Sequence, residues 1–540
     1  MSTRKRIFQA AFVVMLLNVL SKILGFTREQ IFAMFFGATG EIDAKVAAEK
    51  ITSVIAVLSG PVSTTFLPVF ASFVAKGDDE GAKRTTSSII TLSTLLVLAV
   101  ALALFIPAPY VVRLMSPGFG EETLRTATML TRVLLPAMLL PLLIAFAKSV
   151  LNTYENFAVP AFAPSIQNMI LIATAALFGP VMGVKSLAIG FPSAYIAALA
   201  LHVPAWRRSP SWPSFSVHLD ESTKKVLLMA VPIVLGSVFT QVYMLTNLRL
   251  ASRLAEGSVA ALSFADRLRQ FPLGFFAMAV TTVIFPTLSG MWSKGDREGF
   301  KSTAVNGIRF VEFVCIPAAV GLMVLAKPIV RLVFERGAFV PEHTAAVASA
   351  LTAYSPALAG MAALSVISFV FYASQETRVP VALAVGTALL NVALDVILVG
   401  PLGHVGLALA NSVSQTVGAL VGVYLLNRLL RDLPLRSLSN SLIKVLVSSA
   451  VMGAAAFELS RYSGFHGGTG NVLRDLLTGG IVMGAAVLVY GITAVLLKAE
   501  ETQMLIGLTR TRLAPRLFRY RKDRANGAKE VSQEREERQR

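Results

Sequence analysis

Charged side chains interrupt several long apolar stretches of this chain, and cations predominate among them. The cations of most interest are Lys22, Arg28, Lys50, Arg249 and Arg267. An ionisable group at the centre of a bilayer costs about 2.5–3.5 kcal/mol on insertion scales, so these side chains are expected to face protein or a water-filled cavity. Because arginine binds phosphate oxygens in pairs and lysine acts as a point charge, such a cavity would suit an anionic substrate.

The same charges have a less specific explanation. Cations near the ends of membrane helices commonly extend to the headgroup layer, and neighbouring charges form structural ion pairs. This applies most to three residues near predicted helix ends, namely Lys45, Arg253 and Arg269. Lys45 also stands four residues before Glu49, a spacing at which side chains pair on a helix. Both explanations stay open at the level of sequence.

A second constellation lies in a later apolar stretch. Asn391 and Asp395 are four residues apart, so their side chains meet on one face of a helix. Their oxygens could coordinate Na⁺, or Asp395 could carry a proton, and Asn247 and Asn411 could add further oxygens. The alternative is a hydrogen bond between asparagine and aspartate that holds helices together.

The composition that must position these residues is that of an integral membrane protein. Hydrophobic residues make up 55% of the 540 residues, charged residues only 15%, and the mean hydropathy is +0.67. Several runs approach or exceed the roughly 20 residues that a helix needs to cross a bilayer. We predict an all-α fold of fourteen transmembrane helices at 7–36, 44–74, 86–107, 124–151, 161–182, 185–206, 224–252, 258–291, 304–326, 344–373, 380–400, 404–428, 440–460 and 474–498.

The chain contains an internal repeat. The segment TTFLPVFASFVAKGDDEG at 64–81 returns as TTVIFPTLSGMWSKGDREG at 281–299, and 218 residues separate Lys76 from Lys294. LNTYENFAVPA at 151–161 likewise returns as FYASQETRVPV at 371–381. Chance similarity of apolar segments is the alternative. In a membrane chain, duplication predicts a transporter whose substrate site lies between the two halves.

The distribution of basic residues orients the predicted helices. Alternate loops and the C-terminal tail are rich in Lys and Arg, and an even number of spans places both termini in the cytoplasm. The net charge of +18 therefore fits an anionic membrane surface better than nucleic acid. Since the repeat contains six spans, its halves run parallel around a central cavity. The predicted parts are two lobes, 1–215 and 216–435, two extra helices in 436–500, and a basic tail, 501–540.

Several motifs together resemble the MurJ (MviN) family of lipid II flippases, within the multidrug/oligosaccharidyl-lipid/polysaccharide exporter superfamily. The matching stretches are SKILGFTREQIFAMFFGATGEIDA (21–44), LNTYENFAVPAFAPSIQN (151–168), GSVAALSFADRLRQFPLGF (257–275), FERGAFVPEHT (334–344), FYASQETRVPV (371–381) and PLGHVGLALANS (401–412). They cover both predicted lobes. The two additional C-terminal helices also fit this family. Our hypothesis for the mechanism is that these two helices form the groove for the lipid tail.

The resemblance assigns substrate-facing roles to Arg28, Asp43 and Arg267. Lys22 stands where the family usually has arginine. The family usually carries an arginine pair in the second helix, where this chain has Ala56 and Val57. The Asn391–Asp395 pair resembles a sodium site of some members. We therefore take Lys22, Arg28, Asp43, Lys50, Arg249 and Arg267 as candidate substrate-binding residues, and Asn391, Asp395, Asn247 and Asn411 as a candidate sodium site.

The function implied is movement of an undecaprenyl-diphosphate-linked peptidoglycan precursor across the cytoplasmic membrane of a bacterium, by alternating access. Alternatives are a flippase for another polyprenyl-diphosphate saccharide, a cation-coupled drug exporter of the same superfamily, or a non-transporting scaffold for cell-wall synthesis. We expect no enzymatic activity and no cofactor beyond Na⁺ or H⁺ coupling. The expected partners are the lipid substrate and membrane lipids, with the chain a monomer that could associate with cell-wall synthesis proteins.

Overall fold

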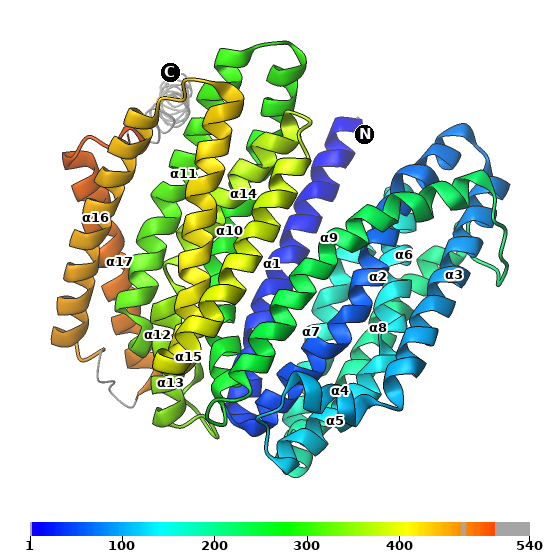
Figure 1. Cartoon of the computed structure of the whole chain (residues 1–540), viewed down its shortest axis with the longest axis horizontal. Coiled ribbons are helices and arrows are strands. Elements are labelled where there is room, and N and C mark those ends of the chain that lie inside the picture. The colour runs from blue at the N-terminus through cyan, green and yellow to red at the C-terminus, as the bar shows by residue number, and fades with distance from the viewer. Residues whose placement is uncertain (1–2, 466–470, 503–540) are drawn as a thin grey trace, which may run out of the picture. The chain divides into compact units, whose positions relative to one another are not determined.

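The computed structural model describes residues 3–465 and 471–502, so most of the predicted basic tail lies outside the described residues. Within these ranges the chain is helical and contains no strand, which confirms the predicted all-α class (Figure 1). Long apolar segments fold this way because a helix satisfies every backbone hydrogen bond within one segment, as the interior of a bilayer requires.

The helices of the first repeat are α1 (Thr3–Phe36), α2 (Gly40–Lys76), α3 (Asp79–Phe105), α4 (Ala108–Met115), α5 (Glu121–Ala137), α6 (Leu139–Thr153), α7 (Ala158–Met182), the 3₁₀ turn η1 (Gly183–Ser186) and α8 (Leu187–Arg207). Those of the second are α9 (Glu221–Ala251), α10 (Ser258–Ser293), α11 (Arg297–Val324), α12 (Ala326–Phe334), α13 (Pro341–Tyr354), α14 (Ala357–Ala373) and α15 (Arg378–Leu430). The chain continues with α16 (Leu435–Tyr462) and α17 (Val472–Leu496). Each of the fourteen predicted ranges coincides with helix.

The backbone repeats as the sequence does. The starts of α2 and α3 precede those of α10 and α11 by 218 residues. The repeated KGD sequence has the same local structure in both copies, because Gly77 and Gly295 adopt positive φ angles of 70° and 73°. The aspartate that follows each glycine accepts a hydrogen bond from the backbone N–H three residues later, at 2.8 Å in the first copy and 2.9 Å in the second. The motif is thus a helix-ending glycine followed by an N-cap.

Two details differ from the predicted helices. The predicted spans 124–151 and 344–373 are each divided into two helices, α5 with α6 and α13 with α14, and the second pair is bent by 43°. Prolines near both breaks remove a backbone N–H from the helical ladder. The short helices α4 and α12 were not predicted, because eight or nine residues are too few to span a bilayer.

Eight helical stretches among the described residues are long and apolar enough to cross a membrane, or nine if the bent pair α13 and α14 counts as one. Two of these stretches, Ala158–Arg207 and Arg378–Leu430, contain 50 and 53 residues. Each exceeds the roughly 20 residues of one crossing, and Gly403 breaks the helical conformation inside the second. The chain is a multi-pass membrane protein, and the number of fourteen crossings remains a prediction.

The chain forms two compact units. Unit 1 comprises Met1–Phe271, Ala326–Gly360 and Thr377–Val421, and unit 2 comprises Pro272–Leu325, Met361–Glu376 and Gly422–Arg540. Compactness groups residues by contact, whereas the repeat groups them by sequence, so the predicted domain boundaries remain a prediction. The charges singled out above all belong to unit 1.

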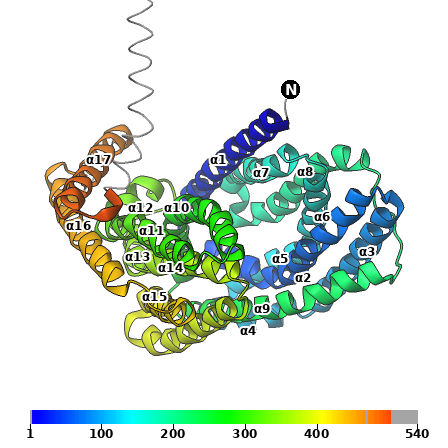
Figure 2. The ribbon, with the colours of Figure 1, turned by 90° about the horizontal axis from the view of Figure 1, so that it is seen from above.

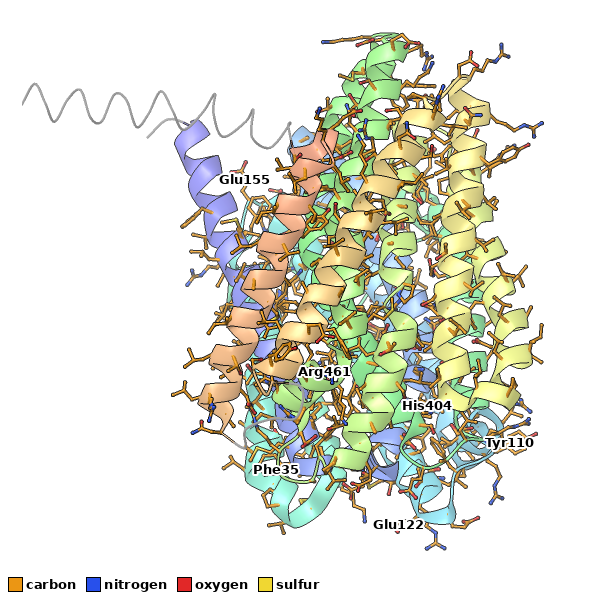
Figure 3. The ribbon with its side chains drawn as sticks, turned by 90° about the vertical axis from the view of Figure 1, so that its left-hand side faces the viewer. Phe35, Tyr110, Glu122, Glu155, His404 and Arg461 are labelled. Atoms are coloured by element: carbon orange, nitrogen blue, oxygen red, sulfur yellow. The ribbon has the colours of Figure 1, made fainter. Side chains whose placement is uncertain are left out.

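Within unit 1, α1 packs along α7, and α2 packs against α5, α6 and α9 (Figure 2). Its core is rich in aromatic rings, with Phe66 stacked on Phe70 and edge-on to Phe146. Glu155 lies toward one end of this unit, and Phe35, Tyr110 and Glu122 lie toward the other (Figure 3). Helices from both repeats therefore share one core, which brings distant charges close together.

Candidate functional site

Two arginines that were predicted to bind substrate, one from each repeat, lie at the same carboxylate. Arg28 on α1 forms an ion pair with its neighbour Glu29 at 2.5 Å. Arg267 on α10 approaches the same Glu29 Oε1 with its Nε at 3.8 Å. We call Arg28, Glu29, Arg267 and Asn168 the Glu29 cluster. The structure thus brings together residues that are more than 230 positions apart in sequence.

The members of the Glu29 cluster differ in their access to solvent. The side chain of Glu29 is 8% exposed, that of Arg28 21% and that of Arg267 46%. The Nε of Arg28 is buried without a hydrogen-bond partner among the described residues. The cluster therefore offers an accessible guanidinium and an unused donor beside a buried acid, which is an arrangement that can receive an anion.

Asn168 on α7 fixes the position of Arg28. Its side-chain oxygen accepts a hydrogen bond from Arg28 Nη1 at 3.0 Å, and its Nδ2 donates to the backbone oxygen of Ser21 at 3.1 Å. The amide lies beside Gly25, and a Cβ added there would meet it at 3.5 Å, an ordinary van der Waals contact. Asn168 was not among the predicted site residues, because it carries no charge. It is nevertheless a polar residue in an apolar stretch, and it ends one of the family-like motifs.

The lysines of α2 have different surroundings. Lys50 interacts electrostatically with Asp266, Asp395 and Arg267, which places it beside the Glu29 cluster. Lys45 is buried, pairs with Glu49 at 3.1 Å and stands 5.2 Å from the ring of Phe32. The predicted pairing of Lys45 with Glu49 is confirmed.

Two further candidate residues are not drawn into the cluster. Lys22 is exposed on α1, one to two turns before Arg28. Arg249 on α9 is half-buried and has no ion pair within the described part of the chain. Their roles in substrate binding remain predictions.

Asp43 has a structural partner instead of the cations. Its carboxylate is 3% exposed, and its two oxygens accept hydrogen bonds from the backbone N–H groups of Gly257 at 2.7 Å and Ala260 at 2.6 Å. These donors belong to the start of α10, where backbone N–H groups lack partners within their own helix. The structure therefore places Asp43 as a cap on a helix of the other repeat. The resemblance led us to expect a substrate-facing role for Asp43, and that role remains a prediction.

The cap is reciprocal. Glu256, which precedes α10, accepts a hydrogen bond from the backbone N–H of Gly40 at the start of α2, at 3.0 Å. We call Asp43, Glu256 and the backbone groups that they bind the α2–α10 junction. Gly257 has a φ of +83°, and a Cβ at this position would overlap the backbone oxygen of Ala38. The junction joins the first and second repeats through charge-assisted hydrogen bonds, which are buried at Asp43 and partly exposed at Glu256.

The Asn391–Asp395 pair is in direct contact. In the amide orientation that satisfies both of its ends, Asn391 donates to Asp395 Oδ2 at 2.8 Å and accepts from the Ser414 hydroxyl at 3.1 Å. Asn247 lies next to the same carboxylate. Asp395 Oδ1 and Asn247 Nδ2 are buried without a hydrogen-bond partner among the described residues. Asn391 and Asn247 both face this carboxylate with N–H groups, so an ion at the orphaned oxygen of Asp395 would require an amide to turn its own oxygen toward it.

Asn411 makes other contacts in this structure. Its side-chain oxygen accepts a hydrogen bond from Arg269 Nη1 at 2.9 Å, and its Nδ2 donates to the hydroxyl of Tyr243 at 3.1 Å. Arg269 also pairs with Asp266 and lies over the ring of Tyr354. The role of Asn411 as a sodium ligand remains a prediction. Arg269 is a buried structural cation and does not reach the headgroup layer.

Known proteins are similar to this sequence over most of its length. The sequence profile described as "Lipid II flippase MurJ" matches residues 32–477. The chain is 28% identical to "Probable lipid II flippase MurJ" of Haemophilus influenzae, over 91% of this chain and 99% of that protein. It is 30% identical to the protein of the same description from Vibrio cholerae, over 78% of this chain and 85% of the relative.

Solved structures agree. A structure described as "Lipid II flippase MurJ, inward closed conformation" has a TM-score of 0.76 and 25% identity, over 90% of this chain and 99% of that chain. An inward-facing multidrug resistance transporter of the MATE family has a TM-score of 0.65 at 16% identity, which shows a shared fold alone. From the match over residues 32–477 and the relatives that cover nearly the whole chain, we conclude that this protein belongs to the MurJ family of lipid II flippases.

Proposed function

We propose that this protein moves lipid II, the undecaprenyl-diphosphate-linked peptidoglycan precursor, from the inner to the outer leaflet of the cytoplasmic membrane. The observation that carries the proposal is the convergence of Arg28 and Arg267, from two repeats, on the single carboxylate of Glu29. The family to which the chain belongs supports the choice of substrate. A diphosphate lipid needs such a site, because unpaired charges cross hydrocarbon only at prohibitive cost.

The chemistry of binding is an exchange of anions. Glu29 holds the two guanidinium groups while the site has no substrate, and a diphosphate would compete for them with more oxygens and more charge. Arg267 is the more accessible of the two and would meet the diphosphate first. Lys50, beside the cluster, would add a point charge. The polyprenyl tail would remain in the lipid throughout.

Alternating access requires a contact that holds one side closed. The α2–α10 junction suits this role, because it joins the two repeats through hydrogen bonds that can form or break as a set. Its release would expose the site to the opposite side of the membrane. Export of an anion from a negative-inside cell is favoured by about 2.3 kcal/mol per charge per 100 mV.

A coupling ion would reset the carrier. Asp395 would hold Na⁺ through its orphaned oxygen, and Asn391 and Asn247 would add ligands once their amide oxygens turned toward the ion; the ion would supply a compact positive charge. A proton on Asp395 is the alternative. Lys50 interacts electrostatically with Asp395. Binding of an ion or proton at Asp395 would therefore change the electrostatic surroundings of Lys50, which lies beside the Glu29 cluster.

The cellular setting follows from the same proposal. The basic loops and tail favour a bacterial cytoplasmic membrane with both termini inside. We expect a monomer that transports and does no covalent chemistry, with association to cell-wall synthesis proteins as a further possibility. The protein would serve peptidoglycan biosynthesis, and through it cell wall biogenesis and cell shape.

A related substrate has one observation in its favour. The second helix carries Val57, which is buried, where the family usually has an arginine, and Lys22 replaces another. Fewer guanidinium groups would weaken selection for one diphosphate head group. Another polyprenyl-diphosphate-linked saccharide is therefore the second candidate substrate.

The test is replacement of the native flippase in a bacterium depleted of it. Arg28→Ala and Arg267→Ala should each fail to restore growth and surface-exposed precursor, since one charge-assisted pair of hydrogen bonds is lost from the site. Arg253→Ala removes an exposed cation of α9's end and is the matched control. Normal growth with both cluster variants at normal abundance would refute the proposed site. Failure of the unaltered chain, with precursor of another saccharide exported, would favour the second substrate.

A further inference from the structure

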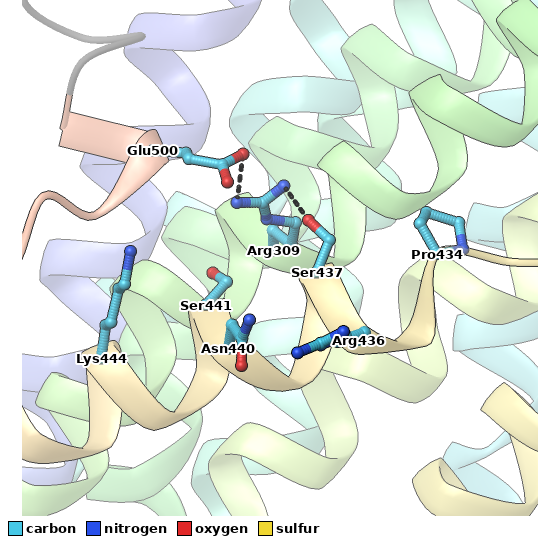
Figure 4. A pocket seen from close by; sticks show the side chains of 8 residues that line it. All are labelled: Arg309, Pro434, Arg436, Ser437, Asn440, Ser441, Lys444 and Glu500. Atoms are coloured by element: carbon cyan, nitrogen blue, oxygen red, sulfur yellow. Dashed lines mark hydrogen bonds and ion pairs between the residues drawn. The ribbon is translucent and has the colours of Figure 1, made fainter.

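A polar pocket of about 450 Å³ opens in unit 2, between α11, the start of α16 and the segment after α17 (Figure 4). The residues that line it are Arg309, Pro434, Arg436, Ser437, Asn440, Ser441, Lys444 and Glu500. None of them belongs to the Glu29 cluster, the α2–α10 junction or the candidate sodium site. The proposed transport cycle therefore gives this pocket no role.

Arg309 forms the floor of the pocket, and two carboxylates, Glu500 and Glu501, more than balance its charge. Its side chain is 8% exposed, with Nη2 2.7 Å from Glu500 Oε2 and Nε 2.8 Å from Glu501 Oε1. The Ser441 hydroxyl donates to the same Glu501 oxygen. Arg309 thus ties α11 to the chain that follows α17, and it is a structural residue of the pocket, not the cation that a ligand would meet.

The rim carries cations that lack an acid. Arg436, Asn440 and Lys444 stand four residues apart on α16, so they share one face, and Figure 4 shows them along one stretch of this helix. Within the described ranges neither Arg436 nor Lys444 forms an ion pair. Lys444 Nζ donates to the backbone oxygen of Lys498 at 3.0 Å, which positions the ammonium without neutralising it.

Neutral donors accompany these cations. Ser437 accepts a hydrogen bond from Arg309 Nη1 at 3.4 Å, which leaves its O–H to donate, and the Asn440 amide is exposed beside it. Pro434, which precedes α16, gives the helix no side-chain cap, so its first backbone N–H groups add partial positive charge at the same end. Two cations with several donors match the oxygens of a phosphate group.

The surroundings of the pocket are those of a lipid and not of a soluble anion. Both α16 and α17 are long and apolar enough to cross a membrane. Their exposed side chains near the pocket are large and apolar, with Ile443 and Leu446 on α16 and Leu496, 73% exposed, on α17. A polar pocket at the end of such helices lies where lipid headgroups are found, and acyl chains could follow the apolar side chains.

We propose that this pocket binds the phosphate of an anionic glycerophospholipid. Arg436 and Lys444 supply the positive charge, and Ser437 and Asn440 donate hydrogen bonds to the remaining oxygens. The Arg309 ion pairs hold the floor in place, and the acyl chains lie along α16 and α17. The site is separate from the Glu29 cluster, so its occupancy is independent of whether the chain transports lipid II.

The experiment measures lipid binding to the purified full-length protein in detergent. Phosphatidylglycerol is titrated, and protein with one bound lipid is quantified by native mass spectrometry. R436Q/K444Q should bind it about tenfold more weakly, since each cation near a lipid headgroup contributes on the order of a few-fold in affinity. R428Q/R431Q is the matched control, because it removes two exposed cations that do not line the pocket and should bind as the unaltered protein does.

Three comparisons decide the identity of the ligand. Phosphatidylcholine should bind more weakly than phosphatidylglycerol, and an excess of inorganic phosphate should leave the lipid bound. Equal loss in the control variant would reduce the effect to general surface charge and overturn the proposal. Displacement by inorganic phosphate would assign the pocket to a free ion, and preferential displacement by undecaprenyl diphosphate would assign it to the transported substrate, and each result would overturn the phospholipid assignment.

The fold of the variant is controlled separately. R436Q/K444Q should melt at the temperature of the unaltered protein without added lipid, because both side chains lie on the rim. The exchanged variant R436K/K444R keeps both charges and should retain binding of phosphatidylglycerol. Loss of binding in R436K/K444R at an unchanged melting temperature would contradict a site that depends on positive charge at these two positions.

Discussion

Glu29 and Asp43 are buried acids on neighbouring helices of the same repeat, yet they have opposite kinds of partner. Asp43 binds two backbone N–H groups at the start of α10, which have no acceptor within their own helix and separate from the carboxylate only if the whole α2–α10 junction opens. Glu29 binds the side chains of Arg28 and Arg267, and one of these is nearly half exposed. A phosphate can therefore take the partners of Glu29 but not those of Asp43. Burial of an acid identifies neither role by itself, and the mobility of its partners separates a structural carboxylate from one at a binding site.

The strongest test of the α2–α10 junction is Gly257→Ala. The glycine has a φ of +83°, and a Cβ would overlap the backbone oxygen of Ala38. We expect a loss of about 3 kcal/mol or more in the free energy of unfolding, because strain and overlap add. The melting temperature of the purified protein measures it. Gly295→Ala is the control, since it has a φ of +73° but open space around it and should lose only about 1–2 kcal/mol. Equal losses would show that the junction tolerates a side chain.

Asp43→Asn tests the carboxylate of the junction. One of its two acceptors becomes an amide N–H, which leaves the backbone N–H of Gly257 or Ala260 unpaired, and we expect a loss of about 1–3 kcal/mol. Thermal unfolding should show this loss. The matched control is Asp78→Asn, an exposed N-cap at which asparagine performs as well as aspartate, so its effect should stay within about 0.5 kcal/mol. If Asp43→Asn left the stability unchanged, the hydrogen bonds of Asp43 would be replaceable, as those of Glu29 are proposed to be.

Glu29→Gln tests the other side of the comparison. Stability should fall by about 1 kcal/mol, since the guanidinium groups are partly exposed and solvent screens their repulsion. Binding of undecaprenyl diphosphate should become tighter, because the anion that competes for Arg28 and Arg267 is gone. Native mass spectrometry of the purified protein can measure both lipid affinity and, on heating, stability. Glu80→Gln, which unpairs the exposed Arg84 instead, should leave lipid affinity unchanged. Weaker binding by Glu29→Gln would show that the carboxylate assists the substrate.

Asp395 is a carboxylate that lies between these two cases, and sodium tests it. Asp395 has one oxygen bound to Asn391 and one without a partner. A sodium ion at ten times its dissociation constant would add about 1.4 kcal/mol of stability. The melting temperature should therefore be higher in sodium chloride than in choline chloride, and Asp395→Asn should abolish the difference. The exposed cap variant Asp296→Asn should keep it; a sodium effect that survives Asp395→Asn would locate the ion elsewhere.

The repeat and the helices were predictable because their causes are local. The KGD motif ends one helix and begins the next through contacts within five residues, so both copies could be recognised from the sequence. Gly403, placed between two predicted helices, is the point at which α15 loses helical dihedral angles. The divisions of α5 from α6 and of α13 from α14 were missed, although prolines marked both.

The candidate site was predicted only in part, for a different reason. The cost of charge in a bilayer selected Arg28 and Arg267 without knowledge of the fold, and the structure brings them together. Asn168 was missed because a neutral amide has no such cost and its importance comes from its contact with Arg28. The contact between Asn411 and Arg269 was not predicted, because the guanidinium comes from a helix about 140 residues away.

The sequence by itself determined that this chain is a duplicated, all-helical membrane protein of the MurJ family, because apolar length, repeated caps and family motifs are properties of the chain read in order. Only the tertiary structure decided which charges are satisfied and which are available. That distinction depends on partners contributed by other helices, and hydrogen bonds as long-range as those from Gly257 to Asp43 or from Gly40 to Glu256 leave no mark in the local pattern of either segment.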